Sequence, residues 1–329
     1  MAEYLTNTTD LTKVASAIRE KGGTSASLVY PDEFVTAIHA IQTGTELQII
    51  VTVKSGATVT ATKGSLSVSG TSVNGTCTLT VPEAGTWSVM ATLSGQTSNT
   101  ETVSVVDRYA IALNFLKGNF ADNDWASIIE ACHSGSVPST WVVGNSKSMT
   151  INGTNYQIDI IGKNHDTYAS GGKAPLTFQL HDCYSEKNMN SNITNAGGWT
   201  SCAMRSTYLP AILALMPTEV QNGIREVNKL TSAGSLSSTI NTTADKLFLL
   251  SEIEIFGSTS LSAPGEGTQY DYYKAGNRKV KNYNGSADSW WERSPFSEYK
   301  GGFCRVDRDG DASYYNANAV YGVAFGFCF

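Results

Sequence analysis

Apolar residues recur at helical spacing near the start of the chain and predict two short amphipathic helices within residues 1–44. The apolar positions of the first are Leu11, Val14 and Ile18. Those of the second, which follows Pro31-Asp32, are Phe34, Ile38 and Ile41. Gly22-Gly23 and Thr43-Gly44 are expected to end the two helices. Helices this short are marginal alone, so residues 1–44 either pack on their own chain or form an attachment or oligomerisation segment.

From residue 45 to residue 107 the apolar period changes to two. The alternating Thr- and Val-rich runs are LQIIVTV, ATVTAT, SLSVSG, TCTLTVPEAGTWSVMATL and TETVSVV. Turn signals such as Asn74-Gly75 and Glu83–Gly85 separate them. This pattern predicts an all-β, immunoglobulin-like sandwich with Trp87 in its core, without the Cys…Trp…Cys pattern of antibody domains. No chemistry is indicated here, so we expect a spacer.

Residues 108–329 mix both periods and predict one α+β domain. Strands are expected at Tyr109–Phe115, Ser148–Ile151, Tyr156–Ile161, Ala174–Gln179 and Leu247–Ile255. Helices are expected at Asp124–Cys132, capped by Asn123 or Asp124, and at Ser201–Leu215 and Pro217–Lys229. The remaining Gly-, Ser-, Asn- and Tyr-rich sequence has little periodicity, so we expect a loop-rich C-terminal half.

Composition narrows the class of protein. Hydrophobic residues make up 41% of the 329 positions, which is enough for packed cores and argues against intrinsic disorder. The net charge is −6 without any basic run, so nucleic acid is not an expected partner. The start lacks the pattern of a signal peptide. The longest apolar runs, Leu47–Val53 and Leu209–Met216, are too short to cross a bilayer, so no membrane insertion is expected.

The sequence offers little for catalysis. Its six cysteines are scattered without zinc-type spacing, so we expect free buried thiols. His165-Asp166 and His181-Asp182 lack a third metal ligand and are expected to form structural hydrogen bonds. Cys132 and His133 are adjacent on a predicted helix and therefore do not face each other. No nucleophile elbow, P-loop or dinucleotide motif occurs, so no catalytic residue, cofactor or metal is predicted.

Two questions stay open in the last strands. Asp307, Asp309 and Asp311 imitate a calcium loop, but Arg305 and Asn316 stand where an EF-hand needs Asp and Glu. A different calcium geometry stays open. Cys304 and Cys328 could also be neighbours across two late strands, and their pairing is left open.

Eleven of the 32 aromatic residues lie within the last 40 positions, residues 290–329. Aromatic, charged and small polar residues alternate there on Gly-rich segments. Their composition is close to that of antibody paratopes, in which Tyr supplies rigid contact area and Ser and Asn supply adaptable hydrogen bonds. We therefore predict a ligand-binding face; the alternative is a loop-rich region whose tyrosines only pack. The candidate residues are Phe296, Tyr299, Arg305, Asp307, Arg308, Asp309, Asp311, Ser313, Tyr314, Tyr315 and Asn316.

The same region carries a resemblance. The C-terminal sequence resembles that of a phage and gut-bacterial family with a C-type-lectin-like fold. The resemblance lies in WWERSP at residues 290–295, then Gly310, then GVAFGF at residues 322–327. This family is akin to formylglycine-generating enzymes and to the variable proteins of diversity-generating retroelements. NAGGW at 195–199 and LLSEIE at 249–254 extend the resemblance. LTKVASAIREKGGTSASLVYPDEF is similar to the start of phage tail proteins of Gram-positive hosts, and residues 45–107 are similar to their immunoglobulin-like modules.

The resemblance implies a phage tail protein that binds a receptor and is not an enzyme. Residues 1–44 would attach it to other virion tail proteins as a homotrimer, and the C-type-lectin-like domain would bind a host-surface protein or glycan. Trp290 and Trp291 would be scaffold, and Arg293 would hold a buried carboxylate or carbonyl. The interleaved candidates would form a face diversified at adenine-containing codons. The expected location is the virion, after synthesis in the bacterial cytoplasm.

Two other functions remain open at this point. The chain could be a structural baseplate or decoration protein without a receptor role. By kinship with formylglycine-generating enzymes it could also be an oxidase. That chemistry needs a closely placed pair of copper-binding cysteines, whereas Cys304 and Cys328 are 24 positions apart.

Overall fold

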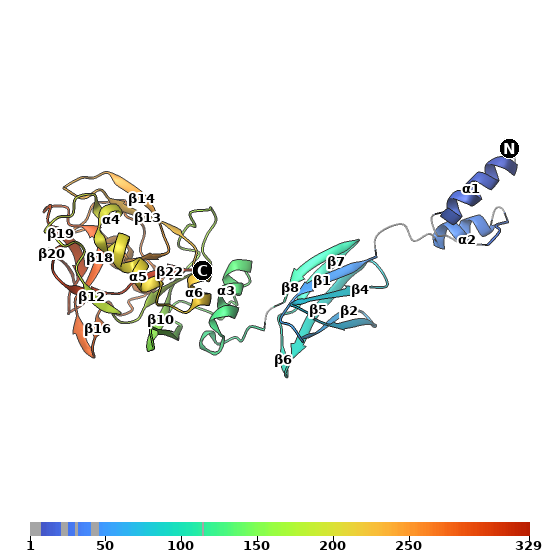
Figure 1. The fold of residues 1–329 in the computed structure, drawn as a ribbon, viewed down its shortest axis with the longest axis horizontal. Helices are drawn as coiled ribbons and strands as arrows, with labels where there is room; N and C mark the ends of the chain where they lie inside the picture. Colours follow the sequence, from blue (N-terminus) through green and yellow to red (C-terminus); the bar gives the residue numbers. More distant parts are fainter. Residues whose placement is uncertain (1–7, 21–25, 30–31, 41–45, 114) are drawn as a thin grey trace. The chain divides into compact units, whose positions relative to one another are not determined.

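The computed structural model describes residues 8–20, 26–29, 32–40, 46–113 and 115–329. Strands make up 38% of the chain and helices 19%, so the protein is mostly β and contains several sheets (Figure 1). The chain divides into two compact units, Met1–Phe115 and Leu116–Phe329. No helix in the described ranges is both long and apolar enough to cross a membrane.

Two helices open the first unit, α1 (Thr8–Glu20) and α2 (Asp32–Ala40). Their small apolar cluster consists of Ala15, Ile18, Phe34 and Ala37, with Leu11 packed against it. Val14 was expected on this face but is exposed, because Leu11, Ala15 and Ile18 follow the i, i+4, i+7 ridge instead. Some residues of the predicted helices lie outside the described part of the chain: Ile41, the two expected helix ends at Gly22-Gly23 and Thr43-Gly44, and the side chain of Ile38.

The rest of the first unit is a two-sheet β domain. Its strands are β1 (Gln48–Thr52), β2 (Thr58–Lys63), β3 (Leu66–Thr71), β4 (Thr76–Thr80), β5 (Gly85–Leu93), β6 (Gln96–Thr97), β7 (Glu101–Val105) and β8 (Arg108–Ala112). One sheet has the order β4-β1-β8, and the other has the order β3-β2-β5-β6 with β7 also paired to β5. Trp87 is fully buried in the shared core, as predicted, and its indole N–H donates to the Glu83 carbonyl.

The strand β8 corrects the predicted domain boundary at residue 107. The sequence assigned this strand to the C-terminal domain, but β8 pairs in parallel with β1 from Gln48↔Arg108 to Thr52↔Ala112. Leu113 and Phe115 then pack into the core of the β domain. Local alternation showed that a strand was present, but only the free edge of β1 determines where it belongs.

The second unit contains two five-stranded sheets, β15-β22-β11-β10-β9 and β12-β21-β18-β19-β20, and two hairpins, β13-β14 and β16-β17. The strands are β9 (Ser146–Ile151), β10 (Thr154–Lys163), β11 (Leu176–Leu180), β12 (Ser185–Lys187), β13 (Val227–Ser232), β14 (Ile240–Asp245), β15 (Leu247–Phe248), β16 (Lys281–Tyr283), β17 (Ser286–Asp288), β18 (Trp290–Pro295), β19 (Gly302–Val306), β20 (Ala312–Asn316), β21 (Tyr321–Val323) and β22 (Gly326–Cys328). The last two strands, β21 and β22, insert into different sheets and join both to one core.

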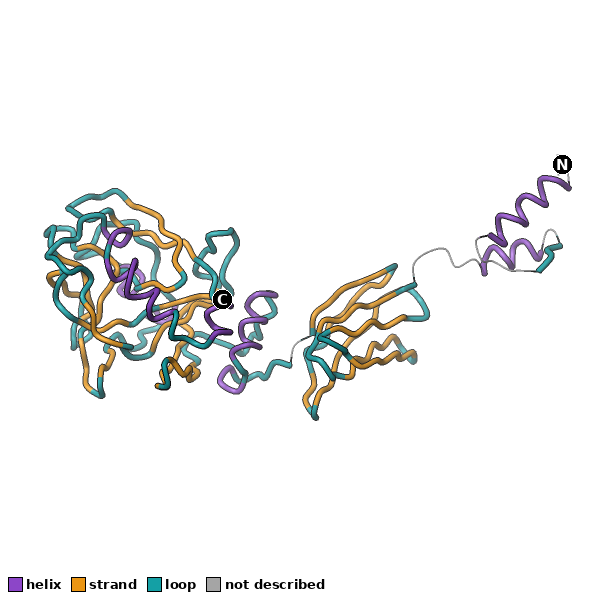
Figure 2. Tube along the Cα trace, viewed as in Figure 1, coloured by secondary structure: helices purple, strands orange, loops and turns teal. Residues whose placement is uncertain are grey.

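Short helices and long loops connect these strands (Figure 2). The helices are η1 (Phe120–Asp122), α3 (Trp125–Ser134), α4 (Gly198–Ser201), the π-helix η2 (Met204–Tyr208), α5 (Leu209–Leu213), α6 (Thr218–Gly223), α7 (Glu252–Phe256) and α8 (Asp271–Lys274). Asp124 caps α3 as predicted, because its carboxylate accepts the Ser127 N–H at 2.7 Å.

Three predicted elements are wrong in length or type. Ser201–Leu215 is not one helix but α4, η2 and α5 in succession. The helix expected at Pro217–Lys229 ends at Gly223, and β13 begins at Val227. The strand expected at Leu247–Ile255 stops at Phe248, because Ser251 and Glu254 form a capping box that starts α7.

Candidate functional site

The aromatic-rich C-terminal region rests on a fully buried strand. Every residue of β18 is buried, and the indole N–H groups of Trp290 and Trp291 donate to the carbonyls of Lys279 and Lys187 at 2.9 and 2.8 Å. Trp290 and Trp291 are thus buried, as the scaffold role predicted for them requires, and Phe303, Phe325 and Phe327 are buried as well. The strand therefore gives the following hairpin, β19–β20, a rigid support.

Arg293 anchors β18 from inside the domain. Its guanidinium forms an ion pair with the Glu254 carboxylate and donates to the Thr231 hydroxyl at 3.0 Å. It also donates to the main-chain carbonyls of Leu230, Leu249 and Glu266. The sequence-based expectation that Arg293 holds a buried carboxylate or carbonyl is confirmed, and it holds both kinds of group.

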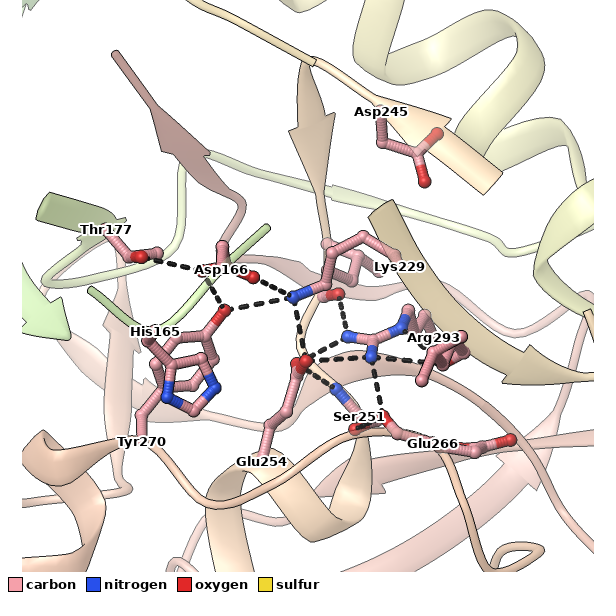
Figure 3. A network of polar contacts seen from close by, with 12 residues as sticks. His165, Asp166, Thr177, Lys229, Asp245, Ser251, Glu254, Glu266, Tyr270 and Arg293 are labelled. Atoms are coloured by element: carbon pink, nitrogen blue, oxygen red, sulfur yellow. Dashed lines mark hydrogen bonds and ion pairs between the residues drawn. The ribbon is translucent and has the colours of Figure 1, made fainter. Parts of the chain in front are cut away.

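Lys229 binds the same carboxylate of Glu254 as Arg293 does (Figure 3). Its ammonium is 2.7 Å from Glu254, 2.8 Å from Asp166 and 3.0 Å from the Tyr270 hydroxyl, so all three N–H donors have partners. Tyr270 and Thr177 in turn donate to the second oxygen of Asp166. His165-Asp166 thus has the structural role that the sequence indicated.

The pKa values of the buried acids follow from these partners. Burial alone would raise the pKa of Asp166, but the charge and hydrogen bond of Lys229 outweigh it and lower that pKa to about 2. Burial likewise opposes ionisation of Glu254, yet Arg293 and Lys229 hold its pKa below the ordinary value. Glu266 differs: burial dominates and raises its pKa to about 7, although Ser294 and the Ser232 N–H donate to it.

A hollow of about 240 Å³ opens beside this network and is bordered by His165, Lys229, Glu254 and Thr268. His165 stacks on Tyr270 with ring centroids 4.0 Å apart, and burial lowers its pKa. The charged groups at the hollow already bind one another. The arrangement is that of a cross-linked core that supports strands, and it offers no charged side chain free to act on a ligand.

Asn195 is a positioning residue that the sequence reasoning did not identify as one. Its side-chain amide donates to the carbonyls of Phe296, Tyr299 and Gly302 at 3.3, 3.0 and 2.8 Å. Its own main-chain N–H donates to the Lys300 carbonyl at 2.7 Å. One buried side chain thus fixes the whole loop between β18 and β19. The signal in the sequence is NAGGW, residues 195–199, which by itself does not show that Asn195 bonds the loop.

Three apolar side chains form an exposed surface that we call the aromatic patch: Ile193, Tyr299 and Tyr314, which are 50%, 43% and 44% exposed. A Cβ atom at Gly301 would lie 2.6 Å from Ile193 and 2.7 Å from Tyr299, so both pack over this glycine. Tyr314 stacks on Phe296 with centroids 3.7 Å apart. Phe296 was predicted to face a ligand, but it is buried beneath Tyr314 and supports the patch instead.

Tyr315 lies on the opposite face of β20 from Tyr314, because successive strand residues alternate in direction. Its ring is in edge contact with Tyr321 at 5.5 Å, and the Arg305 guanidinium lies over both rings, 5.4 Å from Tyr315 and 4.4 Å from Tyr321. The candidate residues therefore form two surfaces, one on each side of the hairpin, and not the single face that the sequence suggested.

The loop between β19 and β20 is built around Asp307. Its carboxylate accepts the N–H groups of Asp309 and Asp311, each at 3.0 Å, so Asp307 shapes the turn. Arg308, Asp309 and Asp311 are exposed, whereas Ser313 and Asn316 are half-buried. Within the described ranges, no group of three or more His, Cys, Asp or Glu side chains is arranged to hold a metal ion.

A second, open hollow of about 360 Å³ lies on the Tyr315 side of the hairpin, and we call it the Arg305 hollow. It is lined by Ser289, Arg305, Asp307, Arg308, Asp309 and Tyr321. The Nε atom of Arg305 is buried without a hydrogen-bond partner. Its guanidinium has no hydrogen bond or ion pair to the described part of the chain. The guanidinium is therefore positioned by its stacking on the rings of Tyr315 and Tyr321.

All six cysteines are free and buried, as predicted. Cys304 and Cys328 are not neighbours across paired strands, because β19 lies between β18 and β20 whereas β22 lies between β15 and β11. Burial raises the pKa of both thiols well above the ordinary value, and it raises that of Cys132 to about 12. These thiols are therefore poor nucleophiles near neutral pH.

Residues 171–328 match the model of a family described as a domain of unknown function, DUF6273. No curated protein and no solved structure matches the chain. The matched stretch contains the Arg293 and Lys229 network apart from Asp166, as well as Asn195 and the β19–β20 hairpin. It leaves out β9 and β10, although Ile158–Lys163 of β10 pairs with β11 from Leu176 to Leu180. The folded unit therefore extends beyond the matched stretch.

Proposed function

We propose that this protein is a phage tail-associated receptor-binding protein whose C-terminal domain recognises a host-surface ligand through the β19–β20 hairpin and the loop before it. The aromatic patch is the observation that carries the proposal. Exposed large apolar side chains that cluster on a rigid support are typical of binding surfaces. Ile193, Tyr299 and Tyr314 cluster in this way, and buried β18 and Asn195 hold their backbone in place.

The support beneath the patch favours recognition of a ligand over a purely packing role. Tyr and Arg side chains held in one geometry lose little entropy on binding. Tyr314 is held by its stack on Phe296, and Tyr299 by the Asn195 bond to its carbonyl. In the proposal the lectin-like scaffold keeps the hairpin backbone constant while exposed side chains such as Tyr299, Tyr314 and Tyr315 vary.

The N-terminal parts have mechanical roles in this proposal. The helices α1 and α2 attach the chain, as a homotrimer, to the virion, and the immunoglobulin-like domain spaces the binding head outward. Val14, Val29 and Val35 are exposed apolar side chains near these helices and are available for such a contact. Several heads on one particle raise the overall affinity by avidity, so each site can be weak.

Cell binding tests the proposal. The full chain is labelled with a fluorophore, and its binding to a panel of Gram-positive bacteria is measured by flow cytometry. We expect the wild type to bind at least one strain and Tyr299→Ser/Tyr314→Ser to lose at least about tenfold in affinity, as expected for hot-spot tyrosines. Tyr109→Ser, which changes an equally exposed tyrosine of the β domain, is the matched control and should bind normally.

A further inference from the structure

The Arg305 hollow carries an inference about the chemistry of the ligand. Arg305 is the unusual member of its lining, because its guanidinium is fixed by two tyrosine rings and lacks a polar partner among the described residues. The two terminal nitrogens of this guanidinium also lack a partner among the described residues and, unlike Nε, are not buried, so they can reach a ligand in the hollow. A guanidinium held in this way matches the planar, two-oxygen geometry of a carboxylate.

A second guanidinium lies at the same hollow. Arg308 is 72% exposed, and its Nε is 3.8 Å from the Asp288 carboxylate, which is too far for a good hydrogen bond. Its long side chain can therefore turn toward a bound anion at little cost. Two cationic groups, one fixed and one adaptable, favour a negatively charged group in the hollow.

The other residues that line the Arg305 hollow argue against a simple anion as its ligand. Asp307 and Asp309 also border the hollow, and Ser289 adds a hydroxyl. One oxygen of Asp307 is already occupied by two N–H groups, but Asp309 is exposed and its carboxylate has no hydrogen bond or ion pair within the described part of the chain. Carboxylates repel an anion unless the same ligand brings donors for them. The ligand must therefore carry hydroxyl groups as well as a negative charge.

An aromatic side chain, that of Tyr321, also lines the hollow and favours a sugar ring as the ligand. Tyr321 lines the hollow, and its ring contacts those of Tyr315 and buried Trp291. Such rings pack well against the apolar face of a pyranose. The space of about 360 Å³ is enough for one monosaccharide unit.

We infer that the Arg305 hollow binds a sugar that carries a carboxylate, of the hexuronic acid class. Arg305 pairs with the sugar carboxylate, Arg308 closes over it, and the ring hydroxyls donate to Asp309 and the free oxygen of Asp307. This inference deepens the proposed function, since it names the ligand chemistry on one side of the hairpin. The aromatic patch on the other side contributes to neither contact.

Saturation-transfer NMR on the full chain tests the inference with sodium glucuronate as the probe. We expect a Kd on the order of 1 mM for so small a ligand. Glucose, which lacks the carboxylate, should bind at least about tenfold more weakly. Arg305→Gln should weaken glucuronate binding by at least about tenfold, and Asp309→Asn should weaken it about threefold, without a change in the circular dichroism spectrum.

Arg225→Gln is the matched control. Its guanidinium also lies over a tyrosine ring, that of Tyr168 at 5.5 Å, but it is not part of the hollow, so glucuronate binding should be unchanged. Equal binding of glucose and glucuronate would overturn the inference, as would unchanged binding by Arg305→Gln. Glutamate binding as tightly as glucuronate would overturn the assignment to a sugar.

The outcomes separate this inference from the proposed function. Glucuronate binding does not use Tyr299 or Tyr314, so the patch variant should bind glucuronate like the wild type. Loss of cell binding by the patch variant with no glucuronate binding by the wild type would overturn only the inference. Glucuronate binding by a chain that binds no cells would contradict only the receptor role.

Discussion

Arg293 and Arg305 lie on neighbouring strands of one sheet, yet they differ in every contact that matters for a guanidinium. Arg293 is fully buried and bonded to a carboxylate, a hydroxyl and three carbonyls. Arg305 is half-buried, and its guanidinium lies over two tyrosine rings without a hydrogen bond or ion pair to the described residues. A charge inside a protein is tolerated only when its donors are satisfied. The comparison teaches that the first arginine belongs to the scaffold and that the second is available for a ligand.

The largest expected effect is that of Arg293→Met. Among the described residues, this change leaves the Glu254 carboxylate with Lys229 as its one cationic partner. It also removes the guanidinium donor from three carbonyls, of which only that of Glu266 is known to keep another donor, the Ser251 hydroxyl. Removing one member of a buried ion pair costs about 3–5 kcal/mol. Urea unfolding followed by tryptophan fluorescence should show this loss in the transition of the C-terminal domain. A loss below about 1 kcal/mol would contradict the scaffold role of Arg293.

The second effect concerns pH. The folded pKa of Glu266, about 7, is raised above its ordinary value of 4.5, so its contribution to stability is complete below about pH 4.5. That contribution is lost as the pH rises through 7, by up to about 3 kcal/mol at full ionisation. Glu266→Gln cannot ionise, so its stability relative to the wild type should increase between pH 5 and pH 8.

Comparing the two proteins at each pH removes the contributions of other groups, such as Glu292 and His165, whose pKa values are also shifted by burial. Thermal unfolding at several pH values measures the difference. A constant difference between wild type and Glu266→Gln from pH 5 to pH 8 would show that Glu266 does not titrate in this range.

The third effect is that of Asn195→Ala, which removes the amide that binds three carbonyls of the Phe296–Gly302 loop. The carbonyls of Tyr299 and Gly302 keep main-chain N–H donors, so the loss falls mainly on the Phe296 carbonyl. One unpaired buried carbonyl costs about 1–3 kcal/mol. Because this loop carries Tyr299, we also expect faster dissociation from cells. Unfolding and flow cytometry measure the two consequences. Unchanged dissociation in a destabilised variant would mean that the loop geometry does not matter for binding.

The smallest effect on stability is expected for Arg305→Gln. Cation–π contacts near the surface contribute about 0.5–1 kcal/mol, and no hydrogen bond to the described residues is lost. Unfolding under the same conditions as for Arg293→Met should show a change within about 1 kcal/mol. A loss as large as that of Arg293→Met would remove the contrast between the two arginines and make Arg305 a scaffold residue as well.

Sequence patterns predicted those parts of the fold that depend on local periodicity. The alternation in residues 45–107, the Asp124 cap, and the burial of Trp290 and Trp291 are confirmed by the structure. The strand β8 was detected but assigned to the wrong domain, because its partner β1 lies about sixty residues earlier. The capping box of Ser251 and Glu254 was readable in the sequence, but the apolar run before it dominated the prediction.

The candidate site was predictable as a region but not as a geometry. The aromatic excess correctly indicated a cluster near the C-terminus, of which Tyr299, Tyr314 and Tyr315 are exposed. The burial of Phe296 depends on its stack against Tyr314, and the separation of Tyr314 from Tyr315 depends on the register of β19 and β20. Neither follows from composition. Asn195 acts across about a hundred residues of sequence, so its role appears only in three dimensions.

Cell binding by the Tyr299→Ser/Tyr314→Ser variant, with its unfolding midpoint recorded on the same sample, tests the central claim most directly. We expect binding to fall at least about tenfold while the unfolding midpoint stays within a few degrees of the wild type, since both side chains are exposed. Wild-type binding by this folded variant would contradict the claim that the aromatic patch is the receptor-binding surface.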